Sequence, residues 1–209
     1  MTPSPTPSRS ALALFDFDGT ITTLETMPVF LRRSIPRHRL VLGWIVLAPL
    51  ILAYRLRLVP GTFVRRVVVW FGYAGLSCSA VGTAGEAFAR DYLPTVLRAE
   101  AVERLAWHKE QGHRVVVVSG GLDVYLAPWC KAAGVELLGS SLLSRGGILT
   151  GRYSGRQCVR DEKVRRVRKL CDLHAYPVIY AYGDTPEDHA MLAIADRKYY
   201  QWRELGPAR

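Results

Sequence analysis

Leu12-Ala13-Leu14-Phe15-Asp16-Phe17-Asp18-Gly19-Thr20-Ile21 is an apolar run that ends in two carboxylates two residues apart, with a glycine directly after them. A run this short, closed by a glycine turn, predicts a buried strand of a parallel sheet that delivers Asp16 to its carboxyl end. Open α/β sheets bind their ligands at that edge. Residues i and i+2 of an extended chain point the same way, so Asp16 and Asp18 are expected to share a pocket. The alternative interpretation is an acidic turn without chemistry.

Two neighbouring carboxylates repel each other unless a cation lies between them. A hard divalent ion with oxygen ligands satisfies both groups, and Mg²⁺ is the simplest choice. One carboxylate can then act as a nucleophile while the other moves protons, which is the division of labour that an aspartyl-phosphate intermediate requires. The opening stretch therefore predicts phosphoryl chemistry at the end of the first strand.

Composition narrows the classes of protein and partner. The chain has 209 residues, 49% of them hydrophobic, so it can bury a sizeable core as one domain with an insertion or as two small domains. Its formal net charge of +10 favours anionic partners. Because no zinc-finger spacing, basic heptad region or aromatic ribonucleoprotein motif is present, no nucleic acid partner is expected. Four widely spaced cysteines predict free thiols in a reducing compartment, and hence a cytoplasmic protein.

Two segments differ from the rest in composition. Residues 1–10 are rich in Pro, Ser and Thr and lack the pattern of a secretion signal or transit peptide, so they predict a disordered tail. Residues 26–85 contain eight arginines and neither Asp nor Glu. Within them, the apolar run 40–54 is shorter than the roughly 20 residues that span a bilayer, and Pro49 would kink a helix there. This run is a buried helix, an interfacial segment or a re-entrant one.

A second segment has the pattern of a buried parallel strand. Residues 114–119 are rich in valine and end in Ser119, which a Gly-Gly turn follows. The helix expected over 122–133 offers free backbone amides near this hydroxyl group. Ser119 and the adjoining amides can therefore hold the oxygens of a phosphate group.

A third segment of this kind, 177–182, ends in Gly183-Asp184, with Asp188 four residues further on. These carboxylates and the first one of the opening stretch can hold Mg²⁺ together. Lys163, on a helix predicted over 161–171, can neutralise charge on the nucleophile and the phosphoryl group. Each residue alone also fits an ordinary role, as a turn serine, a capping or surface acid, or a solvated lysine. Their order along the chain is what favours phosphoryl transfer.

These motifs resemble, in the same order, those of a known superfamily. Four parts of the chain are similar to the four motifs of the haloacid-dehalogenase superfamily of Mg²⁺-dependent phosphatases. They are Asp16-Phe17-Asp18-Gly19-Thr20, Ser119, Lys163 and the stretch 183–188. The resemblance covers nearly the whole chain after the tail. It implies an α/β fold in which a Rossmann-like parallel sheet is flanked by helices and carries an inserted helical cap.

A branch of the superfamily is also indicated. Val118-Ser119-Gly120-Gly121-Leu122-Asp123 and Leu149-Thr150-Gly151 resemble the phosphoserine-phosphatase-like branch, subfamily IB. Its cap is inserted between the first and second motifs. The implied division of this chain is therefore a catalytic core of residues 11–24 and 102–209, with a helical cap of residues 25–101.

The resemblance implies a role for each site residue. Asp16 would be the nucleophile, Asp18 the general acid/base and Lys163 the residue that stabilises charge. The metal side, which would hold Mg²⁺, comprises Asp16, Asp18, Asp184 and Asp188.

Substrate contacts follow from the same resemblance. Ser119 and Gly120 would contact the phosphate. Glu25, nine residues after the nucleophile, lies where a cap-side acid of phosphoserine phosphatase contacts the substrate amine. The adjoining Thr22-Thr23-Leu24 departs from that enzyme, so the role of Glu25 is a candidate one.

The apolar, arginine-flanked cap points to a different substrate. Together with Cys158, Glu162-Lys163-Val164 and the stretch 180–184, it resembles the bacterial branch that includes phosphatidylglycerophosphatase C, whose members act on a lipid phosphate at the membrane. This implies a cap that contacts an anionic membrane surface, at the inner face of the cell membrane. A small soluble phosphate monoester is the alternative substrate. A membrane-binding relative without activity is a third possibility, but no member of the catalytic set is missing.

Overall fold

The computed structural model describes residues 10–206, so the predicted tail lies outside the described residues except for Ser10. Its centre is a six-stranded sheet in the order β3-β2-β1-β6-β7-β8. β1 pairs in parallel with both β2 and β6, and among the described strands of this sheet only β8 runs antiparallel to its neighbour. The predicted α/β fold with a parallel sheet is confirmed. The strands are β1 (Leu12–Phe15), β2 (Arg114–Leu122), β3 (Glu136–Ser140), β6 (Ile179–Gly183), β7 (Arg197–Tyr200) and β8 (Arg203–Leu205).

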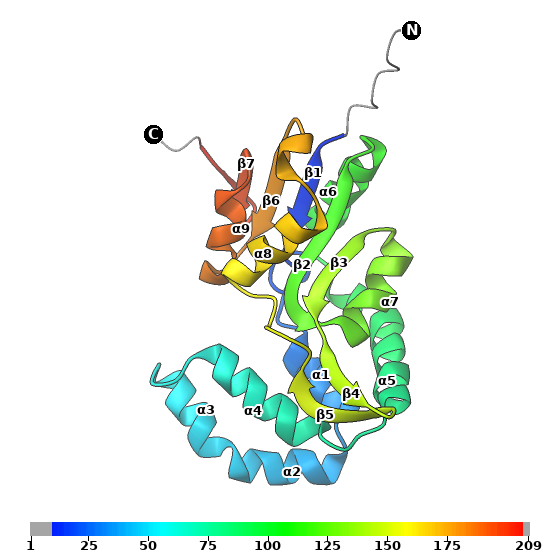
Figure 1. Ribbon diagram of the computed structural model, residues 1–209, viewed down its shortest axis with the longest axis vertical. Helices are drawn as coiled ribbons and strands as arrows, with labels where there is room; N and C mark the ends of the chain where they lie inside the picture. Colours follow the sequence, from blue (N-terminus) through cyan, green and yellow to red (C-terminus); the bar gives the residue numbers. More distant parts are fainter. Residues whose placement is uncertain (1–9, 207–209) are drawn as a thin grey trace, which may run out of the picture.

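Helices cover both faces of the sheet, which is why the central strand is apolar throughout (Figure 1). Ala13 and Phe15 belong to one buried cluster, and Leu12 and Leu14 to the other, because successive side chains of a strand point to opposite faces. The first cluster includes side chains of α6 and α7, and the second includes side chains of α8 and α9. These helices are α6 (Ala99–Glu110), α7 (Asp123–Ala133), α8 (Asp161–Leu170) and α9 (His189–Ala193).

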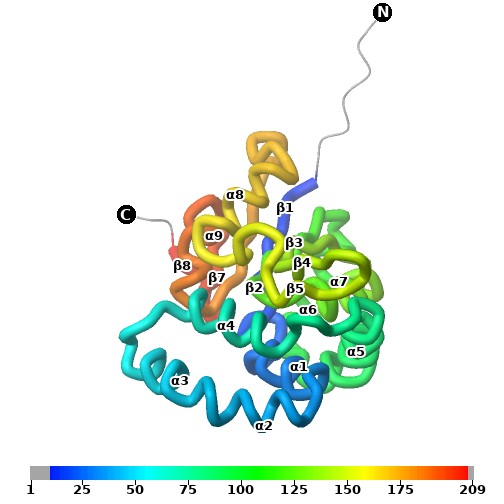
Figure 2. Tube along the Cα trace, turned by 60° about the horizontal axis from the view of Figure 1, so that its bottom comes forward, coloured from blue at the N-terminus to red at the C-terminus, as the bar shows by residue number. Residues whose placement is uncertain are grey.

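Between β1 and β2 the chain forms a group of helices at one end of the molecule. Figures 1 and 2 show α2, α3 and α4 together beyond the carboxyl ends of the strands, while α5 runs alongside α7. α2 and α3 meet at 57°, and Pro49 lies in the first turn of α3, as the predicted kink requires. The elements are α1 (Met27–Ser34), α2 (Arg37–Val46), α3 (Ala48–Arg55), α4 (Gly61–Tyr73), α5 (Cys78–Asp91) and the 3-10 turn η1 (Leu93–Val96).

A β-hairpin is formed by β4 (Leu142–Arg145) and β5 (Ile148–Tyr153). It packs against α4 and the connection from α4 to α5, where the amide of Gly75 donates to the carbonyl of Leu149 at 2.8 Å. Gly151 has φ +73, and a Cβ there would lie 2.9 Å from the backbone of Trp70. The hairpin therefore approaches α4 as closely as a glycine permits.

The apolar run 40–54 is not a buried helix. Trp44 and Ile45 are 68% and 71% exposed, and Gly43 is the one buried residue of α2. None of the described helices is by itself long and apolar enough to cross a bilayer, although α2 and α3 together reach the length and hydropathy as a bent pair. The structure therefore contradicts the buried-helix alternative and does not test the interfacial and re-entrant ones.

Candidate active site

The carboxyl ends of three adjacent strands bring the predicted residues together. Asp16 directly follows β1, and its amide still donates to the carbonyl of Tyr182 in β6 at 2.9 Å. Ser119 lies within β2, and Asp184 directly follows β6. Because the three strands are parallel neighbours, residues far apart in sequence meet at one edge of the sheet.

Three carboxylates form a compact acidic cluster at this edge. Asp16, Asp184 and Asp188 each offer an oxygen atom, and these atoms lie within 4.8 Å of one another. Asp188, in the 3-10 turn η3 (Pro186–Asp188), is fixed because its Oδ2 accepts from the amides of Asp184 and Thr185, both at 3.1 Å. Burial raises the pKa of Asp184 to about 6, and the charge of Asp188 adds to the shift. An all-oxygen cluster of this kind suits a hard cation such as Mg²⁺.

The loop after β1 closes over this cluster. Gly19 has φ +78, and a Cβ there would lie 2.1 Å from Oδ2 of Asp184, so only glycine permits the approach. The hydroxyl group of Thr20 donates to Oδ1 of Asp184 at 3.3 Å. The loop of the first motif therefore positions the acid that follows the third strand.

Lys163 lies between two of these carboxylates. Its Nζ donates to Oδ1 of Asp16 at 2.5 Å and to Oδ1 of Asp188 at 2.6 Å, and the side chain is 2% exposed. Burial alone would lower the pKa of Lys163, but the two carboxylates more than offset it and raise that pKa. Burial also raises the pKa of Asp16, an effect that Lys163 opposes and Asp188 strengthens. Lys163 is thus a permanent cation beside the predicted nucleophile.

Asp18 is oriented differently from the acidic cluster. Its Oδ1 accepts from the amide of Thr26 at 2.8 Å and from the hydroxyl of Thr26 at 2.5 Å, and Tyr125 contacts that hydroxyl at 3.1 Å. Burial raises the pKa of Asp18 to about 6, although the hydrogen bonds from Thr26 oppose the shift. A carboxyl group with a pKa near neutrality can both give and take a proton. The structure therefore sets Asp18 apart from the other three acids predicted to hold the metal.

Ser119 and Gly120 lie on β2, the strand next to β1. The Oγ of Ser119 accepts from the amide of Gly121 at 3.0 Å, and the side chain is buried. The turn expected after Ser119 is instead part of β2, whose pairing with β3 shifts register between Val118 and Leu122. A Cβ on Gly120 would lie 2.7 Å from Val159 and 3.3 Å from Nη1 of Arg65.

Arg65, on α4, is a site residue that the sequence did not single out. Its Nη2 donates to Oε1 of Glu187, in η3, at 2.6 Å, and its Nη1 lies over Gly120. Partial desolvation raises the pKa of the exposed Glu25, and the positive charge of Arg65 opposes that shift. The excess of arginine over acid in 26–85 was the available signal, but it did not distinguish one arginine from seven others.

Residues 13–193 match the haloacid dehalogenase-like hydrolase family, and the chain belongs to this family. The predicted superfamily and the hydrolase class are thereby confirmed. Over 193 residues, the chain is 33% identical to protein CicA of Caulobacter vibrioides, covering 91% of this chain and 85% of that protein.

Two solved structures have a similar fold. A protein of unknown function from Bordetella pertussis Tohama I is 24% identical, with a TM-score of 0.81 over 92% of this chain and 90% of that one. A phosphoserine phosphatase, solved as an analogue of its phospho-aspartyl intermediate, is 21% identical, with a TM-score of 0.64 over 92% and 86% of the two chains. At these identities the structures establish the shared fold.

Proposed function

We propose that the protein is a Mg²⁺-dependent phosphatase that hydrolyses a phosphate monoester through an aspartyl-phosphate on Asp16. The observation that carries the proposal is the buried contact of Lys163 with Asp16 and Asp188, which combines a candidate nucleophile, a fixed cation and an acidic cluster. The structural likeness to a phosphoserine phosphatase captured as a phospho-aspartyl analogue supports the same chemistry.

The reaction has two steps on these residues. A carboxylate oxygen of Asp16 attacks phosphorus, the bond from phosphorus to the ester oxygen breaks, and Asp18 gives its proton to that leaving oxygen. Asp18 then takes a proton from a water molecule that attacks phosphorus, which releases phosphate and restores the carboxylate of Asp16. Lys163 and the groups around Ser119 and Gly120 hold the charged oxygens during both steps.

We assign metal binding to three of the four acids that the sequence predicted for it. Asp16, Asp184 and Asp188 would hold Mg²⁺, because their oxygens already converge. When bound, Mg²⁺ supplies positive charge that offsets the charge of the phosphoryl oxygens. The carboxylate of Asp18 is engaged by Thr26, so we assign it to proton transfer and not to metal binding.

Residues 25–101 are proposed to form the cap over a core of residues 11–24 and 102–209. Two contacts join the helices of this segment to the core beside the site: the Arg65–Glu187 ion pair, and the hydrogen bond from Gln157 to the carbonyl of Thr62 at 2.8 Å. Glu25 and Arg65 are then the cap residues that contact the part of the substrate beyond the phosphate.

A membrane lipid phosphate such as phosphatidylglycerophosphate is the proposed substrate, with the protein peripheral at the inner face of the cell membrane. Support comes from the apolar helix surface, an unusually large set of exposed apolar side chains on α2, α3, α4 and the turn between α3 and α4. The arginines around it and the absence of acid from 26–85 suit an anionic leaflet. The apolar helix surface consists of Val41, Leu42, Trp44, Ile45, Val46, Leu52, Tyr54, Leu56, Leu58, Phe63 and Trp70.

A soluble phosphate monoester of the phosphoserine type is the second candidate. The fold shared with phosphoserine phosphatase and the pair of Glu25 and Arg65 near the site favour it. Such a pair can bind the amino and carboxylate groups of an amino acid.

A phosphate-release screen tests the proposal. Lipid phosphates in mixed detergent micelles are compared with sugar, amino-acid and nucleotide phosphates, with Mg²⁺ and with EDTA, using Asp16→Asn as the matched inactive control. Release from the lipid by the wild-type protein alone supports the lipid substrate, and release from phosphoserine supports the second candidate. Failure to release phosphate from any of them in Mg²⁺ contradicts the proposed phosphatase activity.

A further inference from the structure

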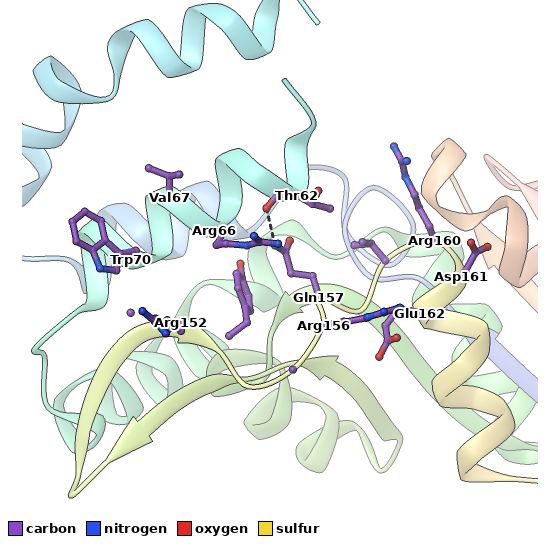
Figure 3. A pocket seen from close by; sticks show the side chains of 14 residues that line it. Thr62, Arg66, Val67, Trp70, Arg152, Arg156, Gln157, Arg160, Asp161 and Glu162 are labelled. Carbon is purple, nitrogen blue, oxygen red and sulfur yellow. Dashed lines mark hydrogen bonds between the residues drawn. The ribbon is translucent and has the colours of Figure 1, made fainter. Parts of the chain in front are cut away.

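A cavity beside α4 is separate from the acidic cluster. It has a volume of about 850 Å³ and opens between α4, β5 and the chain that leads into α8 (Figure 3). None of the catalytic carboxylates lines it. Cavities of roughly 300–1,000 Å³ are the usual size of small-molecule sites.

Four arginines line this cavity and give it a strong positive charge. Arg66 comes from α4 and Arg152 from β5, while Arg156 and Arg160 come from the loop before α8. Within residues 10–206, none of these four guanidinium groups forms an ion pair with a carboxylate.

The acids of the lining do not balance this charge. Asp161 and Glu162 are the two that line the cavity. The carboxylate of Glu162 is already bound by Arg165 at 2.6 Å and by Arg166 at 2.9 Å. One acid is therefore left to face four arginines, and an anion in the cavity would relieve their mutual repulsion.

The four arginines are exposed, so a ligand can reach them from solvent, and two further features of the cavity lining stand out. Gln157 is 8% exposed and its Nε2 donates to the carbonyl of Thr62, yet its buried Oε1 has no hydrogen-bond partner among the described residues. This oxygen accepts hydrogen bonds, so it is met by a water molecule or by a donor group on an organic part of the ligand, and not by phosphate oxygens. Arg160 has φ +52, a region that favours glycine, so the chain keeps this arginine at a position where the backbone opposes it.

We propose that the arginine cavity, defined by Arg66, Arg152, Arg156 and Arg160, binds a small anion that carries two or more phosphate groups. Guanidinium groups bind phosphate through two parallel hydrogen bonds, and four of them match more than one phosphate. Trp70, 56% exposed at the same cavity, offers an apolar face to an organic part of the ligand. Because Arg66 lies on α4 and the others on the segment from β5 to α8, the bound anion joins these two parts of the molecule.

Isothermal titration with pyrophosphate in EDTA at low salt tests the site. We expect the wild-type protein to bind, and Arg152→Gln/Arg156→Gln to bind at least about tenfold more weakly, because two charge-assisted contacts are lost. The control Arg37→Gln/Arg168→Gln removes the same charge from exposed arginines outside the cavity and is expected to bind as the wild type does. Equal binding by the cavity variant and the wild type, or no wild-type binding at millimolar pyrophosphate, overturns the proposal.

Hydrogen exchange supplies a second measurement on the same proteins. Pyrophosphate should slow exchange of the α4 amides (Gly61–Tyr73) in the wild type and leave those of α5 (Cys78–Asp91) unchanged. Binding without protection of α4 would contradict the link between Arg66 and the other arginines. Neither measurement needs metal or turnover, so this site and the proposed phosphatase activity can fail independently.

Discussion

Charged side chains are usually exposed and apolar side chains buried. The edge of the sheet departs from the first rule, and the apolar helix surface departs from the second. At the edge, Asp16, Asp188 and Lys163 are charged and buried, and each has a charged partner. On the helix surface, large apolar side chains such as Trp44 and Ile45 are exposed and have none. Stability alone favours neither arrangement, because buried charges and exposed apolar groups both cost free energy. The proposed phosphatase chemistry would account for the first arrangement, and the proposed membrane contact for the second.

The largest effect is expected at the nucleophile. Asp16→Asn should lower kcat by at least about 10⁴-fold, the scale of losing a catalytic nucleophile, because an amide does not attack phosphorus. Steady-state phosphate release measures this, with the exposed Asp161→Asn as control. Turnover by the Asp16 variant at the wild-type rate would contradict the aspartyl-phosphate.

Removing the buried cation should lower stability as well as activity. Lys163→Met leaves two buried carboxylates unpaired, so the free energy of unfolding should fall by about 3–5 kcal/mol. Urea denaturation measures this against Lys169→Met, an exposed lysine on the same helix that should change stability by about 0.5 kcal/mol or less. Equal stability of the two variants would show that the buried ion pairs contribute nothing.

Removing the metal tests whether the acidic cluster, and not other acids of the chain, holds Mg²⁺. EDTA should abolish phosphate release and added Mg²⁺ should restore it, because three carboxylate oxygens converge. Asp184→Ala should raise the Mg²⁺ concentration needed for half-maximal activity by about 10–100-fold. The exposed Asp91→Ala is the control, and an unchanged Mg²⁺ requirement in the Asp184 variant would contradict the assignment.

Substitutions on the apolar helix surface should weaken binding to membranes and leave the free energy of unfolding nearly unchanged. Trp44→Ser/Ile45→Ser should weaken co-sedimentation with phosphatidylglycerol vesicles about tenfold, because less apolar area leaves water. Its free energy of unfolding should stay within about 0.5 kcal/mol of wild type, since both side chains are exposed. Val102→Ser, at an exposed apolar residue of α6, is the control. A wild-type protein that ignores these vesicles at low salt would contradict membrane binding.

His108 offers a third kind of site, in which an ionisable group is buried without a charged partner. Its ring contacts His113 at 2.8 Å and the hydroxyl of Tyr182 at 2.9 Å, and burial, with His113 and Arg104 adding to it, lowers its pKa to about 3. The folded state therefore binds fewer protons than the unfolded chain between pH 6.5 and about 3. Stability should fall as the pH drops through this window and not above it.

The contribution of His108 to stability can be measured as the difference between the pH profiles of the wild type and of a His108 variant. Between pH 6.5 and 5.5 the wild type should lose about 1 kcal/mol more than His108→Gln, since each unit of pKa difference corresponds to about 1.4 kcal/mol. The exposed His38→Gln should follow the wild type. Parallel pH profiles for wild type and His108→Gln would show that this histidine does not remain neutral.

Local patterns in the sequence were sufficient to predict the parallel sheet and the order of the site residues along the chain. Buried parallel strands are continuous apolar runs, so β1, β2 and β6 and the polar groups at their ends were predicted. The kink at Pro49 followed from the proline. The short strands β7 and β8 were missed. Arg197–Tyr200 is not an apolar run, and it forms a strand by pairing with β6 on one side and β8 on the other.

Only the tertiary structure decided which side chains meet and which face water. Arg65 and Glu187 are 122 residues apart in sequence, so no local pattern links them. Asp18 has the same sequence signature as a metal ligand, yet folding places Thr26 against its carboxylate. The composition of the apolar run 40–54 indicated a segment that avoids water. Composition alone does not distinguish burial in the protein core from contact with another surface. The packing of α2 and α3 left Trp44 and Ile45 at the surface, because burial depends on neighbours that the sequence does not locate.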